Sequence, residues 1–557
     1  MEEKFEEPCQ TYFTIFTDKQ TEGYKYQYLS PFEFKDILIS SATKGVGIKN
    51  VRDAGRGNPN FFCTLPRYAF ALLLKICTNI GEQIGFENDI GIMPQQKGIG
   101  EQLDVLLHKV RKQQGGKFLG EACKKMRIIS GMHKDEFAYN LVISTIGCYY
   151  PNPPRVQTFV EPVLIEFLDK HIYRSKTSLQ DKVNIMPTEG CASAIIYVFD
   201  SLKYNGLVMP KDTIGILTPI FSPYLEIPAL ANYNLIQVCI KADPDNNWEI
   251  PQSEIDKIGD TKMKALFLVN PTNPTSLSLS SSTVRKIAAV VRIKNPNLII
   301  LEDNVYAPFC NEFNDFFNVL PKNTIGVFSF SKYFGVTGWR LGSIILHKNN
   351  IIDKVLLKNA PKETHDRYNK LTTKPEKLKF IDRILADSRQ VAEAHVAGLS
   401  TPQQTLMALF ATYDILDKNY DYRNTLDNIL IERMENLLEP LEYDFLPSNL
   451  DCNYYIVIDI VKVATKITRD AKFGEYLQNN RDPLEFLIDL AKNYGVVLLP
   501  AVSFAGPFWS VRVSLANLDT DDYKPIGENV KDLILKYHDD FRKWTVRKNK
   551  EEIKKSQ

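Results

Sequence analysis

The sequence lacks any apolar run of the ~18 residues that a membrane-spanning helix needs, which argues against an integral membrane protein of that kind. It begins MEEKFEEP, and these four glutamates are the opposite of a signal peptide's basic start, so we expect no secretory leader. The 68 Lys and Arg residues balance 67 Asp and Glu residues to a net charge of +1. That balance leaves no excess of positive charge for nucleic acid or anionic lipid, and we expect a cytoplasmic protein that binds neither.

Cysteine and histidine are scarce and irregularly spaced. The nine cysteines form no CxxC pair and their number is odd, so we expect reduced thiols rather than a disulfide framework. The seven histidines form no HExxH or HxH pattern, so no metal site is predicted. With 44% hydrophobic and 24% charged residues, the chain has the composition of a globular protein, and its 557 residues suffice for more than one domain.

From about residue 160, short β-branched runs alternate with helical patterns. Strands are predicted at 183–187, 213–218, 236–241, 264–270, 298–303, 324–329 and 342–347. Such alternation is typical of an α/β fold with a mainly parallel sheet and helices on both faces. A long helix is predicted at 402–440. Later strands, at 453–460, 495–502 and 510–517, indicate a second, smaller α/β domain.

The strongest chemical signal is SFSKYFGVTGWRLG (329–342), which directly follows a predicted strand. A lysine at the end of a buried strand loses hydration, and the same setting lowers its proton affinity and suits Schiff-base formation by Lys332. The hydroxyls of Ser329 and Ser331 and the guanidinium of Arg340 would together bind a phosphate. The alternative is a surface lysine in a loop.

Two further motifs follow predicted strands, at the sheet edge where open α/β sheets bind ligands. In ILEDNVYAPF (300–309), Asp303 is suited to pair with a protonated ring nitrogen and Tyr306 to donate to a ring phenolate oxygen. In LVNPTNPTS (268–276), Asn273 would donate its amide to the same oxygen. The alternatives are an N-cap aspartate and a plain turn.

Three weaker motifs complete the set. At the strand-to-helix junction MPTEGCASAI (186–195), backbone amides at the helix N-terminus would cradle phosphate. Phe221 in TPIFSPY would stack on a planar ring, or is a buried core aromatic. Arg512 in the apolar strand SVRVSLAN needs an anion, either a substrate carboxylate held bidentately or a structural salt-bridge partner.

Together these positions supply a Schiff-base lysine, a ring-nitrogen partner, two ring-oxygen donors, a ring stacker, a phosphate cup and a carboxylate clamp. That is the inventory for pyridoxal 5'-phosphate, which acts as an electron sink for carbanions. Their joint occurrence favours a cofactor site over six separate structural explanations.

With these motifs, residues 180–345 resemble the fold-type I pyridoxal-phosphate aminotransferases of the aspartate aminotransferase superfamily. A closer resemblance, to the bifunctional aspartate aminotransferase and L-aspartate 4-decarboxylase family, covers nearly the whole chain. The stretches that carry it are LSPFEFKD (29–36), AGRGNPNF (54–61), GCYYPNPPR (147–155), SKYFGVTGWRLG (331–342), KFIDRILADSR (379–389), HVAGLSTPQQ (395–404) and VRVSLANL (511–518).

The resemblance implies roles for fifteen residues. Cofactor contacts are implied for Lys332, Asp303, Tyr306, Asn273, Phe221, Ser329, Arg340, Gly190, Cys191, Ala192 and, from a neighbouring subunit, Tyr150. Substrate contacts are implied for Arg512, which would take the α-carboxylate, and for Gly57, Arg56 and Lys35. The group that holds the side-chain carboxylate stays open between Arg389, Arg56 and Lys35.

Two positions depart from the pattern that the resemblance leads us to expect. The phosphate loop has Gly190, Cys191 and Ala192 where the family usually has Gly-Gly-Thr, which removes one hydroxyl and keeps the backbone amides. Ser276 stands where the superfamily usually has a glycine.

The resemblance also implies how the chain is divided into domains. We expect an N-terminal segment, 1–64, that packs with the small domain and the active site, and a helical insertion at 65–150. The large cofactor domain would span 151–400, with a mixed, mostly parallel sheet. A linking helix and the C-terminal part of the small domain would follow at 401–557, and both termini would contribute to that domain.

The implied reaction converts L-aspartate to L-alanine and carbon dioxide, together with transamination between aspartate and a 2-oxo acid such as 2-oxoglutarate. We expect a homodimer or a larger assembly of dimers. One alternative is an aspartate-type aminotransferase without decarboxylation. The other is a non-catalytic sensing module with an aminotransferase-like domain, although no basic helix-turn-helix pattern is evident.

Overall fold

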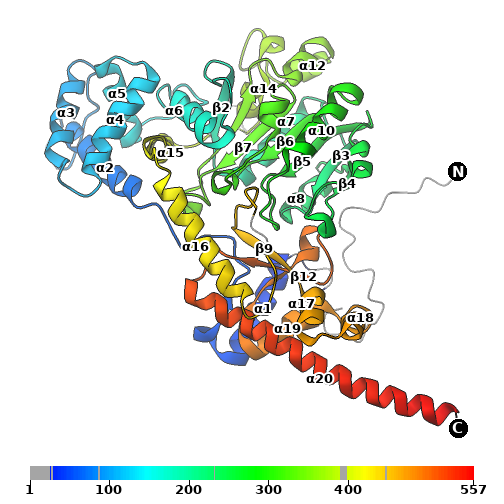
Figure 1. Ribbon diagram of the computed structural model, residues 1–557. Coiled ribbons are helices and arrows are strands. Elements are labelled where there is room, and N and C mark those ends of the chain that lie inside the picture. Colours follow the sequence, from blue (N-terminus) through cyan, green and yellow to red (C-terminus); the bar gives the residue numbers. More distant parts are fainter. Residues whose placement is uncertain are drawn as a thin grey trace.

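The computed structural model describes residues 26, 29, 31–85, 88–230, 232–359, 361–388, 398–445 and 448–556. Figure 1 shows three parts: a large domain around a central sheet, a smaller domain below it, and a group of helices beside the large domain. The site described below lies between the first two parts.

The central sheet has seven strands in the order β2-β8-β7-β6-β5-β3-β4. Its strands are β2 (Val183–Thr188), β3 (Thr213–Thr218), β4 (Ile236–Lys241), β5 (Met263–Val269), β6 (Ile299–Asp303), β7 (Thr324–Ser329) and β8 (Gly342–His347). Only β8 runs antiparallel to its neighbours in this sheet. The prediction of a mixed, mostly parallel sheet is therefore confirmed, and each predicted strand agrees within about a residue.

Helices cover both faces because successive strand residues point to opposite sides. In β5, Ala265 and Phe267 pack into one apolar cluster, and Leu266 and Leu268 pack into the other. The first face carries α6 (Val160–Phe167), α7 (Cys191–Tyr204) and α14 (Phe380–Ser388), and the second carries α9 (Gln252–Lys257), α10 (Ser281–Lys294) and α11 (Phe316–Val319). Short helices α8 (Pro223–Glu226), α12 (Ile351–Asn359) and α13 (Lys362–Asp366) complete this domain.

The smaller domain combines segments from both ends of the chain. Strand β1 (Arg52–Asp53) pairs with β10 (Val496–Val497), and α1 (Pro31–Val46) packs on α19 (Pro483–Tyr494). An antiparallel sheet is formed by β11 (Leu499–Pro500), β12 (Ser510–Ser514) and β9 (Tyr455–Asp459). Helices α17 (Ile460–Thr468), α18 (Ala471–Asn480) and α20 (Tyr523–Ser556) surround it, and α20 extends well beyond the domain (Figure 1).

The single long helix predicted at 402–440 is wrong. The structure has two helices, α15 (Thr401–Leu416) and α16 (Asp421–Leu438). The carboxylate of Asp417 accepts hydrogen bonds from the backbone N–H groups of Asp421 and Tyr422, which stabilises the start of the second helix. Tyr420 adopts a left-handed conformation, with φ of 56°, so the backbone is not helical between α15 and α16.

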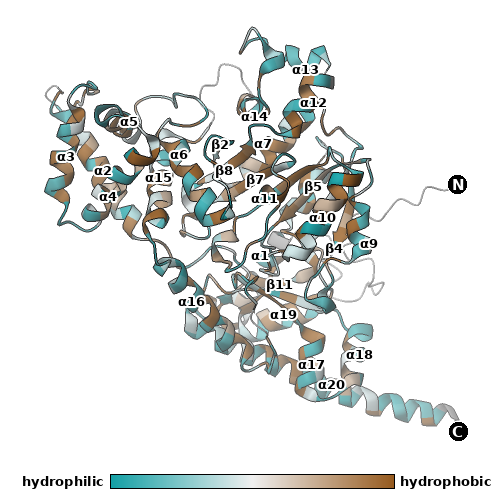
Figure 2. Ribbon diagram, turned by 45° about the horizontal axis from the view of Figure 1, so that its top comes forward, coloured by the Kyte–Doolittle hydropathy of each residue, from teal (hydrophilic) through white to brown (hydrophobic). Residues whose placement is uncertain are grey.

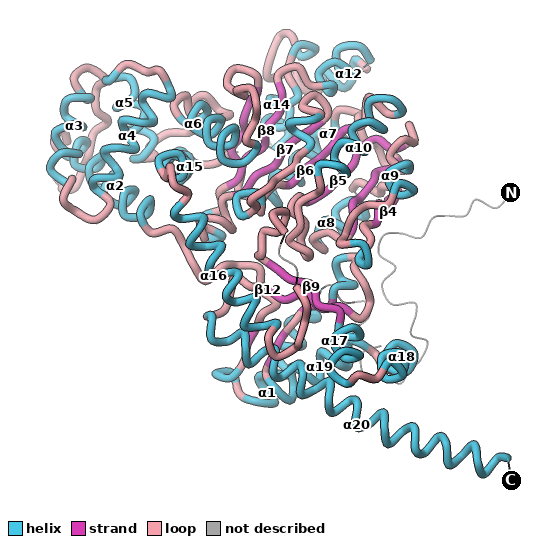
Figure 3. The backbone as a smooth tube through the Cα atoms, viewed as in Figure 1, coloured by secondary structure: helices cyan, strands magenta, loops and turns pink. Residues whose placement is uncertain are grey.

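The helical region at one side contains α2 (Leu65–Glu82), α3 (Ile99–Val110), α4 (Gly116–Ser130) and α5 (Lys134–Ile146) (Figure 3). Helices α2, α4 and α5 pack on α15, and α3 packs on the other three. Figure 2 shows that the buried strands are predominantly hydrophobic, whereas the projecting end of α20 is predominantly hydrophilic. Among the described helices, none is both long and apolar enough to cross a membrane.

Candidate active site

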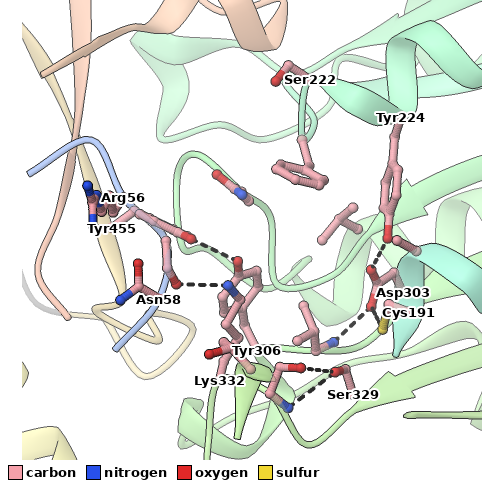
Figure 4. A pocket seen from close by; sticks show the side chains of 18 of the residues that line it. Arg56, Asn58, Cys191, Ser222, Tyr224, Asp303, Tyr306, Ser329, Lys332 and Tyr455 are labelled. Carbon is pink, nitrogen blue, oxygen red and sulfur yellow. Dashed lines mark hydrogen bonds between the residues drawn. The ribbon is translucent and has the colours of Figure 1, made fainter. Parts of the chain in front are cut away.

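A cavity of about 480 Å³ lies where the carboxyl ends of the central strands face the smaller domain (Figure 4). Its floor comes from the ends of β5, β6 and β7, because parallel strands bring their carboxyl ends to one edge. Its other walls come from residues 55–58 and from β9 and β12 of the smaller domain. Segments from three distant regions of the sequence therefore meet in one site.

Lys332 lies three residues beyond the end of β7 and points into this cavity. Its Nζ donates to the backbone oxygen of Gly57 over 2.8 Å and has no carboxylate within ion-pair distance in the described part of the chain. Burial and then the nearby charge of Arg512 lower the lysine pKa to about 8. About a tenth of this amine is therefore neutral and nucleophilic at pH 7, far more than for a lysine of ordinary pKa.

Asp303, the last residue of β6, is buried at the opposite side of the cavity. Its carboxylate accepts hydrogen bonds from Cys191 Sγ at 3.1 Å, the Tyr224 hydroxyl at 2.8 Å and the Val305 backbone N–H at 3.1 Å. Burial raises the pKa of this carboxyl, and the three donors oppose that rise. The arrangement holds one carboxylate in a fixed orientation toward the cavity (Figure 4).

A second group of residues forms a place for an anion. The Ser329 hydroxyl donates to Ser331 Oγ over 2.9 Å, and Cys191 and Ala192 begin α7 at the cavity wall. The exposed Arg340 donates to the backbone oxygen of Glu189 over 3.1 Å. Hydroxyls, a guanidinium and a helix N-terminus together favour a phosphate or a similar anion.

Arg512 in β12 is buried beside the lysine, with its guanidinium between the rings of Tyr455 and Phe504 at 4.4 Å and 4.7 Å. It donates to Asn273 Oδ1 over 3.2 Å and to the backbone oxygen of Gly55. Its Nε is buried without a hydrogen-bond partner, and no carboxylate of the described residues forms an ion pair with it. A buried cation with only neutral partners favours the interpretation as an anion receptor over a structural salt bridge.

The structure brings most of the predicted residues together. Thirteen of the fifteen line the cavity: Lys35, Arg56, Gly57, Cys191, Ala192, Phe221, Asn273, Asp303, Tyr306, Ser329, Lys332, Arg340 and Arg512. Gly190 lies just behind the wall, where an added Cβ would come within 2.5 Å of the Arg340 guanidinium. Tyr150 is 63% exposed and does not line this cavity. Arg389 lies outside the described residues.

The sequence motifs missed two tyrosines. Tyr224 donates to Asp303, and Tyr455 lies within 3.0 Å of the Tyr306 hydroxyl. Tyr224 closes the TPIFSPY motif, three residues after Phe221, so its position could have drawn attention to it. Tyr455 begins a strand of the other domain, and no local pattern indicates that its side chain crosses to the large domain.

Ser276 shows how this chain accommodates the absence of a glycine. Its φ is 64°, in the left-handed region that favours glycine. The Ser276 hydroxyl accepts a hydrogen bond of 2.7 Å from the backbone N–H of Tyr455, so the side chain links the two domains.

Comparison with known proteins agrees with this arrangement. The "Aminotransferase class I and II" family matches residues 152–529. A Pseudomonas protein named bifunctional aspartate aminotransferase and L-aspartate beta-decarboxylase is 37% identical over 519 residues, which cover 92% of this chain and 97% of that protein. A Pyrococcus horikoshii aspartate aminotransferase is 30% identical over 166 residues, which cover 29% of this chain and 40% of that protein.

Solved structures show the same fold. Thermus thermophilus aspartate aminotransferase with maleate aligns at a TM-score of 0.56 and 16% identity, covering 90% of this chain and 96% of that one. Thermotoga maritima aspartate aminotransferase aligns at 0.56 and 15% identity, covering 92% and 99%. On the family match and the full-length relative, this chain belongs to the class I and II aminotransferases.

Proposed function

We propose that this enzyme converts L-aspartate to L-alanine and carbon dioxide and also transaminates between aspartate and 2-oxoglutarate, with pyridoxal 5'-phosphate as cofactor. The observation that carries the proposal is one cavity holding a neutralisable lysine, a buried carboxylate and a buried guanidinium without a carboxylate partner. The bifunctional Pseudomonas relative, similar over almost its whole length, supports the choice of aspartate and of decarboxylation.

The residues present fit this cofactor by their chemistry. Lys332 would bond to its aldehyde carbon, and Asp303 would hold its protonated ring nitrogen. Asn273 and Tyr306 would donate to the ring oxygen, and Phe221 would lie against the ring. The phosphate would be held by Ser329, Arg340 and the amides of residues 190–192. A cavity of about 480 Å³ has room for a cofactor and a small substrate.

When bound, pyridoxal phosphate supplies an electron sink that stabilises negative charge next to the substrate amine. Asp303 would stabilise a positive charge on the ring nitrogen, since an ionised carboxylate stabilises an adjacent cation. Arg512 binds the α-carboxylate and orients the Cα–H bond. The amine of Lys332 would remove the Cα proton as a general base, and its pKa of about 8 suits proton transfer in both directions.

The hold on the side-chain carboxylate decides between the two products. A tight bidentate guanidinium would stabilise the ionised carboxylate and oppose its loss as carbon dioxide. Arg56 lines the cavity but is tied to Asp53 over 2.8 Å and is 56% exposed, and Lys35 also lines the cavity. We assign the side-chain carboxylate to Arg56 and Lys35. Arg56 is exposed and shared with Asp53, so it holds the carboxylate less tightly than a dedicated bidentate guanidinium would, which permits decarboxylation.

Product analysis tests the proposal. Purified holoenzyme is incubated with L-aspartate alone and with added 2-oxoglutarate, and alanine, oxaloacetate, glutamate and carbon dioxide are quantified. We expect alanine and carbon dioxide in equal amounts, with glutamate only when 2-oxoglutarate is present. Glutamate and oxaloacetate without enzymatic alanine would identify an aminotransferase that lacks the decarboxylase activity. No conversion of aspartate would refute the proposal.

We also propose a homodimer at least, in which Tyr150 completes the neighbouring subunit's phosphate site. Its 63% exposure and its absence from the chain's own cavity support this placement. Mixing inactive Lys332→Ala with an impaired Tyr150→Phe protein should restore part of the activity, because some heterodimers carry one intact site. No recovery despite proven subunit exchange would contradict a shared site.

Cofactor uptake should depend on pH through Lys332. The neutral amine is the reactive form, so the rate at which apoenzyme takes up pyridoxal phosphate should rise with pH and level off above about 8. The measurement is stopped-flow absorbance after mixing across pH 6–10. A rate that keeps rising to pH 10 would mean that the lysine has an ordinary pKa.

Gly190→Ala should weaken cofactor binding by about tenfold or more, on the order of a charge-assisted hydrogen bond. An added Cβ would lie 2.5 Å from the Arg340 guanidinium and would displace it from the phosphate position. Gly206→Ala is the control for general destabilisation, since Gly206 also has positive φ but does not line the cavity and has open space around its Cβ position. Fluorescence titration gives both affinities, and equal losses in the two variants would show that the contact with Arg340 is not the cause.

A further inference from the structure

A pair of buried phenols joins the two domains at the cavity. Tyr306, from the loop after β6, and Tyr455, the first residue of β9, have their hydroxyl oxygens 3.0 Å apart (Figure 4). Both side chains are about 97% buried. In the described part of the chain, neither hydroxyl has another hydrogen-bond partner. Each phenol has one proton, so only one of the two hydroxyls can donate the hydrogen bond between them, and the other must accept it.

The surroundings of Tyr455 hold its ring in place. Its backbone N–H donates to Ser276 Oγ over 2.7 Å, and the Arg512 guanidinium lies 4.4 Å from its ring centroid. A Cβ added to Gly57 would come within 2.6 Å of the Tyr455 hydroxyl, so that glycine leaves the space that the hydroxyl fills. The hydroxyl is thus held at the cavity wall next to Tyr306, on the lysine side.

The number of protons fixes the direction of the hydrogen bonds. If the Tyr306 hydroxyl donates its hydrogen bond to the ring oxygen of the cofactor, it has no second proton to donate. Its oxygen can then only accept a hydrogen bond from the Tyr455 hydroxyl. The Tyr455 hydroxyl then donates to Tyr306, and chained hydrogen bonds of this kind strengthen one another in a low-dielectric interior.

We infer that Tyr455 is a positioning residue that donates to Tyr306 and thereby directs the Tyr306 proton toward the cofactor ring oxygen. The inference rests on the proposed function, because it presumes that the ring oxygen lies beside Tyr306. It assigns to the smaller domain a part in setting the electronic state of the cofactor, in addition to binding the substrate.

The test is a spectrophotometric pH titration of the holoenzyme, following its visible absorption band. Donors to the ring oxygen stabilise its negative charge and lower the proton affinity of the adjoining lysine nitrogen. Tyr306→Phe should therefore raise the titration midpoint by about one pH unit, and Tyr455→Phe by about half a unit. The double variant should titrate like Tyr306→Phe alone, because Tyr455 acts only through Tyr306.

Tyr523→Phe is the control. Tyr523 is a buried tyrosine of the smaller domain that does not line the cavity, and its hydroxyl donates to the backbone oxygen of Ser514 over 3.0 Å. This variant should leave the midpoint unchanged. Phenylalanine at 455 keeps the ring against Arg512, so the KM for aspartate should change less than about twofold, whereas Tyr455→Leu should raise it.

The outcomes separate the two proposals. If Tyr306→Phe shifts the midpoint but Tyr455→Phe does not, or if the two shifts add in the double variant, the role of Tyr455 is wrong and the proposed function stands. If wild-type protein with added pyridoxal phosphate develops no titrating visible band, the proposed function is wrong, and the inference with it.

Discussion

Lys332→Ala should lower turnover of aspartate by more than about 1,000-fold, because it removes both the nucleophile that holds the cofactor and the base that moves the Cα proton. The variant should also lose the visible absorption of the holoenzyme. Both readouts come from one preparation, by product quantification and absorbance. Residual activity near that of the wild type would mean that another amine carries the chemistry.

The loss of activity in Lys332→Ala should not come from unfolding. The pH dependence of the free energy of unfolding tests this, and it also tests whether Lys332 is desolvated. The native-state pKa of Lys332, about 8, lies below its ordinary value of 10.5, so between these pH values the unfolded chain binds more protons. The free energy of unfolding of wild-type apoprotein should therefore rise with pH relative to Lys332→Ala, by roughly 1–3 kcal/mol across that window. Urea unfolding of the two apoproteins at pH 7.5 and pH 10 measures the difference. A constant gap would mean that Lys332 is not desolvated.

Arg512→Ala should raise the KM for aspartate by about 30-fold or more while cofactor affinity changes little. The variant loses a buried, charged hydrogen bond to the substrate carboxylate, which is worth on the order of 2–5 kcal/mol. Steady-state kinetics and cofactor titration on the same protein separate the two effects. The reverse result, lost cofactor with retained substrate affinity, would show that Arg512 supports the fold or the cofactor.

Arg512→Lys is the informative companion. An ammonium keeps the charge but not the planar pair of donors that suits a carboxylate, and it packs less well between Tyr455 and Phe504. Its KM should fall between those of the wild type and the alanine variant. A lysine variant as impaired as alanine would indicate that geometry, rather than charge, dominates recognition.

Local pattern was sufficient for the sheet and for the residues at strand ends. Asp303 and Lys332 follow β6 and β7, and neighbouring parallel strands bring such positions together whatever the rest of the chain does. The β-branched runs also predicted the strand bounds of the central sheet closely. In the smaller domain the strand predicted at 495–502 is wrong, because the structure has two short strands there, β10 and β11, and the strand predicted at 510–517 ends at Ser514. The prediction of one continuous helix at 402–440 was wrong because the Asp417 side chain accepts hydrogen bonds from the first backbone amides of a new helix. Hydrophobic periodicity alone does not reveal such a break.

Contacts between the domains could not be predicted from pattern. The side chain of Tyr455 meets Tyr306 from 149 positions away, and Gly57 accepts from Lys332 across 275 positions. Such pairs depend on how the two domains pack, and neither residue has a local signal for its partner. The resemblance implied a place for Gly57 near the substrate, and the structure adds that its carbonyl accepts a hydrogen bond from Lys332.

The most direct test of the account is to reduce the holoenzyme with borohydride, digest it and locate the pyridoxyl group by mass spectrometry. Among the lysines that the structure describes, only Lys332 combines burial, a lowered pKa and a surrounding anion site. The account predicts a single modified peptide containing Lys332. Modification at another lysine, or scattered over surface lysines, would contradict it.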